Sequence, residues 1–144
     1  MCEIFISADP NSYDGRTRSV RLHGVVTSIR LENLFWAVLE EIAERDGMGV
    51  VQLIEKLYDE LIEARGEAGN FASFLRVSAL RYEAMLAHQR IPMDREVPIR
   101  SLDPHAVLHA LPAGWGRAAV PQAQPAAPSS SARAWAAAKS SAPV

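Results

Sequence analysis

The chain has 144 residues and a formal net charge of −2 at pH 7, and 49% of its residues are hydrophobic, which is enough apolar material for one compact domain. No apolar run reaches the about 18 residues of a membrane helix, and no basic-then-apolar leader opens the chain, so we expect a cytoplasmic protein. The single cysteine, Cys2, excludes an internal disulfide and a cysteine-rich zinc site.

The charged residues are segregated along the chain. Residues 16–31 contain four arginines and no acidic residue, whereas residues 32–67 contain ten acidic residues. Attraction to phosphate depends on the local charge rather than on the net charge. The basic segment is therefore compatible with nucleic-acid binding, and the acidic remainder argues against a non-specific binder.

Residues 1–17 are predicted to form an amino-terminal arm or an extra strand, because a short apolar run is followed by turn-forming residues. In residues 16–24, Val20 and Leu22 alternate with polar neighbours, a pattern that fits either a strand or an extended arm. His23, which precedes a glycine, is expected to lie in a turn.

In the next stretch the spacing of the apolar residues changes at Glu32. Over residues 25–31 the alternation predicts a strand with Thr27, Ile29 and Leu31 on a buried face and Val26, Ser28 and Arg30 on the other. From Glu32 the apolar spacing becomes three or four, which predicts an amphipathic helix that ends at Asp46-Gly47. A second helical stripe runs from Val50 to Leu61.

The remainder of the chain is predicted to contain less regular structure. Asn70 is expected to cap a third helix that begins at Phe71 and packs on the core. Residues 89–111 form an irregular, proline-interrupted extension with one short helix beginning at Pro104. Residues 112–144 are rich in Ala, Pro and Ser and cannot bury enough apolar surface to offset the entropy of ordering, so we expect a disordered tail.

One strand and two helices cannot close a core alone, and a two-fold dimer with paired strands is the simplest solution. With this order of one strand and two helices, the sequence resembles the ribbon-helix-helix family of bacterial DNA-binding proteins, typified by the Arc and MetJ repressors. The matching positions are the strand at 26–31, Ile42-Ala43-Glu44, the Asp46-Gly47 turn and Leu53-Ile54. The resemblance implies a mainly α fold with a short β element: an intertwined dimer with a two-stranded antiparallel ribbon, extended by the third helix to a domain at 18–88.

The resemblance also implies roles for individual side chains. In this family the ribbon enters the major groove, so Val26, Ser28 and Arg30 are expected to contact bases. Arginine can pair with guanine, serine can bond to several base edges, and valine can pack on a thymine methyl group. For Arg30, a salt bridge to Glu32 at the rim is the alternative interpretation.

Contacts to the DNA backbone are expected from Arg18 and Arg21 before the strand and from Gly49 and Val50 at the start of the second helix. Family members usually carry a serine or a similar residue there, whose hydroxyl binds a phosphate. Here Gly49 and Val51 lack that hydroxyl, so only backbone N–H groups remain for the phosphate.

The dimer core expected from the resemblance is apolar and comes from the strand and both helices. Its members are Ile29, Leu31, Leu34, Val38, Ile42, Leu53, Ile54, Leu57 and Leu61.

The chain shows no phosphate-binding glycine loop, zinc-protease motif or Ser/His/Asp constellation, so we expect no enzyme, no cofactor and no metal. The expected function is a sequence-specific transcriptional regulator that binds double-stranded DNA as a homodimer, with two dimers side by side on tandem sites, at the bacterial nucleoid. Two alternatives stay open: an antitoxin-type autoregulator whose tail binds a toxin, and a dimeric adaptor that kept the fold without binding DNA.

Overall fold

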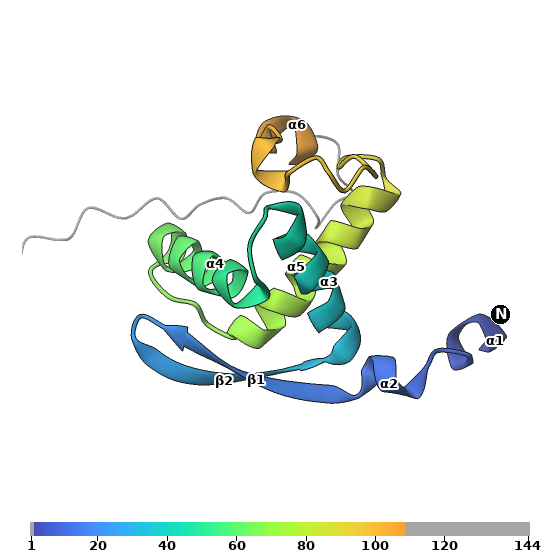
Figure 1. Cartoon of the computed structure of the whole chain (residues 1–144), viewed down its shortest axis with the longest axis horizontal. Helices are drawn as coiled ribbons and strands as arrows, with labels where there is room; N and C mark the ends of the chain where they lie inside the picture. The colour runs from blue at the N-terminus through green and yellow to red at the C-terminus, as the bar shows by residue number, and fades with distance from the viewer. Residues whose placement is uncertain (1, 109–144) are drawn as a thin grey trace, which may run out of the picture.

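The computed structural model describes residues 2–108, so the expected tail at 112–144 lies outside the described residues. Two strands are followed by three long helices (Figure 1). The strands are β1 (Gly15–Leu22) and β2 (Val25–Glu32), and the helices are α3 (Asn33–Arg45), α4 (Val50–Arg65) and α5 (Phe71–Ala87). Shorter elements flank them: α1 (Cys2–Ile6), α2 (Pro10–Tyr13), the 3₁₀ turn η1 (Ile99–Ser101) and α6 (Pro104–Leu108).

Both strands of the ribbon come from the same chain. β1 and β2 pair antiparallel in one two-stranded sheet, with Leu22 opposite Val25 and Gly15 opposite Glu32. The two-residue turn between them has positive φ at both positions, 48° at His23 and 82° at Gly24, as a type I′ turn requires. The two-stranded antiparallel ribbon is confirmed, and within this chain it is formed by β1 and β2. The expected pairing with a strand of a second copy stays a prediction.

The amino-terminal segment is helical rather than extended. α1 and α2 take the place of the expected extra strand, and they project to one side of the ribbon and the helices (Figure 1). The side chain of Asp9 accepts a hydrogen bond from the N–H of Asn11 at 3.0 Å, which starts α2 in the manner of a helix cap. The first strand begins at Gly15, inside the arm expected for residues 1–17.

The three long helices agree with the sequence pattern. α3 ends at Arg45, and Gly47 follows with a φ of 69°. α4 ends at Arg65, and the C-cap Gly66 follows with a φ of 81°, the left-handed conformation that suits a helix terminus. α5 begins after Asn70, whose side chain accepts a hydrogen bond from the N–H of Ser73 at 3.1 Å, confirming the predicted cap.

The helices form a layer on one side of the hairpin, and the core lies between the two layers (Figure 1). Its fully buried large side chains are Trp36, Leu31, Leu39, Ile54 and Leu75. Of the expected core, Ile29, Leu31, Leu53, Ile54 and Leu61 are buried, and Val38, Ile42 and Leu57 are partly buried against it. Leu34 is 58% exposed within this chain, because the buried stripe of α3 runs through Trp36, Leu39 and Ala43 instead.

A buried arginine attaches the extension after α5 to the helical layer. Arg45, 6% exposed, donates from Nε to the carbonyl oxygen of Val97 at 3.1 Å and from Nη2 to the carbonyl oxygens of Pro92 and Asp94 at 3.0 and 2.9 Å. Its Nη1 donates to the hydroxyl of Tyr82 at 3.2 Å. Residues 92–97 are irregular, as expected, but they are held by specific contacts.

Candidate nucleic-acid interface

The hairpin has one face covered by helices and one face open to solvent. The register places six side chains on the open face as three cross-strand pairs: Thr17 with Arg30, Ser19 with Ser28, and Arg21 with Val26. All six are exposed. None of them is acidic, so this surface, called here the open ribbon face, combines two arginines with hydroxyl and apolar groups.

The three residues expected to contact bases lie together on the open ribbon face. Val26, Ser28 and Arg30 are exposed, whereas Ile29 and Leu31 are buried and Thr27 is half-buried. The alternation predicted for β2 is therefore confirmed, and their contact with bases stays a prediction. The β1 partners Thr17 and Ser19 were missed, although the alternation of Val20 and Leu22 would place them outward.

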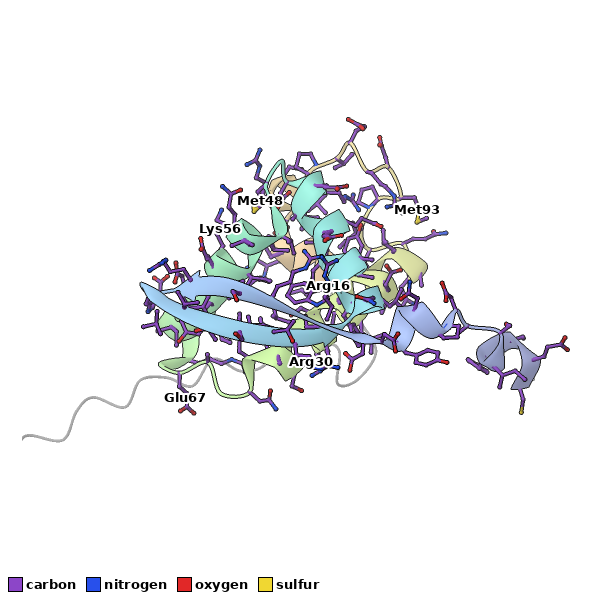
Figure 2. All side chains as sticks on the ribbon, turned by 60° about the horizontal axis from the view of Figure 1, so that its bottom comes forward. Arg16, Arg30, Met48, Lys56, Glu67 and Met93 are labelled. Carbon is purple, nitrogen blue, oxygen red and sulfur yellow. The ribbon has the colours of Figure 1, made fainter. Side chains whose placement is uncertain are left out.

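Arg30 lies at the base of the ribbon, where β2 leads into α3 (Figure 2). Its guanidinium occupies space that a side chain at position 15 would take: a Cβ added to Gly15 would lie 2.7 Å from Nε and Nη2 of Arg30. The carboxylate of Glu32, the salt-bridge partner considered for Arg30, instead accepts from Nε of Arg76 on α5 at 2.8 Å. This hydrogen bond holds the pKa of Glu32 below its ordinary value.

The other end of the ribbon is anchored to α4. Arg21 donates from Nη1 to the carbonyl oxygen of Gly24 at 3.0 Å and so lies across the turn. Nε2 of His23 lies 2.6 Å from Oδ1 of Asp59, and its ring meets Tyr58 edge-on with centroids 5.2 Å apart. These contacts fix the tip of the hairpin against the helical layer.

Arg18 lies on the opposite face from Arg21. Its Nη2 lies 2.5 Å from Oε1 of Glu40, and its guanidinium carbon lies 4.6 Å from the ring centroid of Trp36. Arg18 therefore does not lie on the open ribbon face, and a phosphate contact by its side chain stays a prediction.

The start of α4 also lies apart from the open ribbon face. Gly49 is the N-cap, and its N–H donates to Oε1 of Gln52 at 3.0 Å. α4 belongs to the helical layer, on the other side of the ribbon from the open ribbon face (Figure 1). A phosphate contact at this helix start remains a prediction.

The described residues form neither a metal site nor a membrane-spanning helix, but they do form a groove between two helices. Among residues 2–108 no group of three or more His, Cys, Asp or Glu side chains could hold a metal ion. Within the same range no helix is long and apolar enough to cross a membrane. A groove of about 920 Å³ lies between the end of α4 and α5, and its lining includes Leu61, Phe74 and Val77.

An exposed basic ribbon on a layer of helices defines a ribbon-helix-helix protein. A family model described as "Ribbon-helix-helix domain" matches residues 15–83, and the chain belongs to this family of DNA-binding regulators. No curated protein matches the chain. Among solved structures, an uncharacterized protein from Bordetella pertussis Tohama I is 64% identical, with a TM-score of 0.80 over 83% of this chain and 95% of that one.

Proposed function

We propose that this protein is a sequence-specific transcriptional regulator that inserts its β-ribbon into the major groove of double-stranded DNA. The observation that carries this proposal is the open ribbon face, on which Ser28 and Arg30 lie exposed among side chains that include no acid. The helices cover the other face, so the ribbon can meet DNA without disturbing the core.

The dimensions and chemistry of the ribbon suit this role. The major groove is about 12 Å wide and admits a two-stranded ribbon. Arg30 and Arg21 can each donate two hydrogen bonds to a guanine, Ser28 can bond to several base edges, and Val26 can pack on a thymine methyl group. The acidic charge of the chain lies mainly in residues 32–67, whereas the open ribbon face is positive, which favours a groove-directed approach.

The proposed regulator acts as a homodimer in the bacterial cytoplasm, at the nucleoid, with double-stranded DNA as its partner. Family members typically bind DNA as dimers. Apolar side chains exposed on the helices of this chain support a second copy as partner, namely Leu34 on α3 and Val77 and Leu80 on α5, which are 58%, 53% and 54% exposed. Large apolar patches on a soluble protein commonly mark a protein interface.

The test is selection of genomic fragments on the purified full chain at near-physiological salt, beside Arg30→Ala and Ser28→Ala. Arg100→Ala is the matched control, because Arg100 is an exposed arginine on η1, where its backbone N–H binds Oδ1 of Asp46 at the carboxyl end of α3. We expect one enriched sequence for the native chain and for Arg100→Ala. Arg30→Ala should lose about 1–3 kcal/mol at one base pair and relax its preference there.

The assay distinguishes the loss of a phosphate contact from the loss of a base contact. Loss of a phosphate contact weakens all sequences alike and lowers the salt slope by about one, whereas loss of a base contact changes the selected sequence. If a folded native chain enriches no sequence, the regulator proposal fails, and a DNA-independent adaptor takes its place.

A further inference from the structure

The amino-terminal helix α1 exposes its apolar side chains to solvent. Ile4, Phe5 and Ile6 are 77%, 72% and 78% exposed, and no residue of α1 is buried. Successive residues of a helix point about 100° apart, so a flat surface cannot cover all three side chains at once. An exposed apolar cluster of this kind commonly marks a contact with another molecule.

α1 is held away from the remainder of its own chain. Nδ2 of Asn33, the first residue of α3, donates to the carbonyl oxygen of Asn11 at 2.9 Å, and the N–H of Asn33 donates to the carbonyl oxygen of Asp14 at 2.9 Å. These two hydrogen bonds fix α2 at the base of the ribbon, and α1 projects outward from there (Figure 1). Cover for the apolar side chains of α1 therefore has to come from a second molecule.

The groove between the end of α4 and α5, called here the α4–α5 groove, offers apolar cover. Its lining includes Leu61, Phe74, Val77 and Met85, and its volume is about 920 Å³. Cavities of roughly 300–1,000 Å³ enclose most of the surface of a compact apolar ligand. Because a groove surrounds its occupant on more than one side, it suits a helical turn whose apolar side chains point in several directions.

The charges of α1 and of the α4–α5 groove are complementary. The groove is lined by Arg65, Arg81 and Glu67 and is therefore positive overall. Neither arginine has an ion-pair partner among residues 2–108. Glu3 is the one charged residue of α1 and directly precedes its apolar side chains. Charge complementarity of this kind favours one docking partner and orientation over others.

We propose that α1 of one chain docks in the α4–α5 groove of a second copy of this chain. Glu67 on the lining of the groove and α1 lie at opposite ends of the ribbon, so α1 is remote from the groove of its own chain (Figure 2). Each copy carries both a helix and a groove, so a two-fold dimer exchanges the two helices reciprocally. This contact involves no DNA and goes beyond the proposed function.

A disulfide trap between two different chains tests this docking. Cys2 is the single cysteine of the chain and begins α1, and Ser73 is an exposed residue of the groove lining. The native chain is mixed with the full-length variant Cys2→Ser/Ser73→Cys, so that a mixed disulfide can form only between two copies. Peptide mass spectrometry separates this disulfide from pairs of two Cys2 residues.

The rate of mixed-disulfide formation gives the result. With micromolar protein it should be at least about 100-fold higher than for the exposed control Cys2→Ser/Ser101→Cys, because docking raises the local thiol concentration towards the millimolar range. Equal rates for the Ser73 and Ser101 variants would overturn the proposal.

Substitutions in α1 identify the side chains that carry the docking. Phe5→Ser in the chain that supplies Cys2 should reduce the rate to that of the control, whereas Tyr13→Ser, which alters an exposed aromatic side chain on α2, should leave it unchanged. Glu3→Arg in the same chain should slow the linking, and Arg81→Glu in the groove chain should restore it, because the two charges are then exchanged.

Two further outcomes would overturn the proposal. Fast linking that survives Phe5→Ser would show that α1 does not dock through its apolar side chains. A rapid disulfide within single chains that carry both Cys2 and Ser73→Cys, without linking between chains, would show that α1 covers the groove of its own chain.

Discussion

Replacing Arg45 by methionine tests how the extension after α5 is held. The substitution keeps the apolar stem but removes four hydrogen bonds, to the carbonyl oxygens of Pro92, Asp94 and Val97 and to the hydroxyl of Tyr82. Hydrogen bonds from a charged donor contribute about 1.5–3 kcal/mol each. The net loss is smaller, because removing the guanidinium also removes the cost of burying it.

Water can also replace part of the hydrogen bonding that the Arg45 side chain supplies. Pro92 and Asp94 are exposed and Val97 is half-buried, so their carbonyl oxygens can be hydrated once the guanidinium is gone. We therefore expect Arg45→Met to lower the free energy of unfolding by about 2–4 kcal/mol. With a urea dependence of about 2 kcal/mol/M, the unfolding midpoint should fall by about 1–2 M.

Two measurements on the full chain check this expectation. Urea unfolding followed by circular dichroism gives the change in stability, and hydrogen exchange with mass spectrometry reports the amides of residues 91–97. Arg100→Met serves as the control, because the Arg100 side chain is exposed. A midpoint within about 0.2 M of the native value, with unchanged exchange at 91–97, would refute the reasoning that Arg45 holds this segment.

Two further predictions concern the base of the ribbon. Trp36→Phe removes the hydrogen bond from Nε1 to the carbonyl oxygen of Arg16, 2.8 Å long, and replaces the indole ring under Arg18 by a smaller phenyl ring. The substitution should lower the free energy of unfolding by about 1–2 kcal/mol in urea, and an unchanged midpoint would contradict this. Because Arg76 lowers the pKa of Glu32 in the folded state, this group stabilises the fold above the ordinary glutamate pKa, and the contribution is lost as pH falls through the lowered value. Glu32→Gln should therefore flatten the acid side of a Tm-against-pH profile, and a parallel profile would contradict the assignment.

Local patterns were sufficient to predict the inward face of β2 and the limits of the three long helices, but not the buried stripe of α3, on which Leu34 was wrongly placed. The alternation of Ile29 and Leu31 with polar neighbours fixed the buried face of β2, because side chains in a strand point to alternate faces. Asn70 marked the start of α5, since its side chain can accept a hydrogen bond from the first turn. Each of these two signals depends on residues that are close together in the sequence, so it can be recognised without knowledge of the tertiary structure.

The partner of β2 could not be predicted by the same reasoning, because alternation identifies the buried face but not the strand alongside. The His23–Gly24 turn was the available signal, but the strongest hairpin turns carry Asn-Gly or Asp-Gly. The inward position of Arg18 beside Glu40 could not be predicted either, since it depends on the pairing of β1 with β2. The contacts of Arg45 were out of reach for a different reason: they join residues about 50 positions apart along the chain.

The hairpin also affects how the ribbon forms during synthesis. A ribbon built from two chains can form only after they meet, at a rate that depends on protein concentration. Here residues 15–32 contain the entire ladder, and a hairpin closes in about 1–10 μs, far faster than the ribosome adds the next residue at about 5–20 residues per second. An isolated hairpin is only marginally stable in water, so the emerging ribbon opens and recloses until Trp36 and Leu39 of α3 are available to cover its inner face.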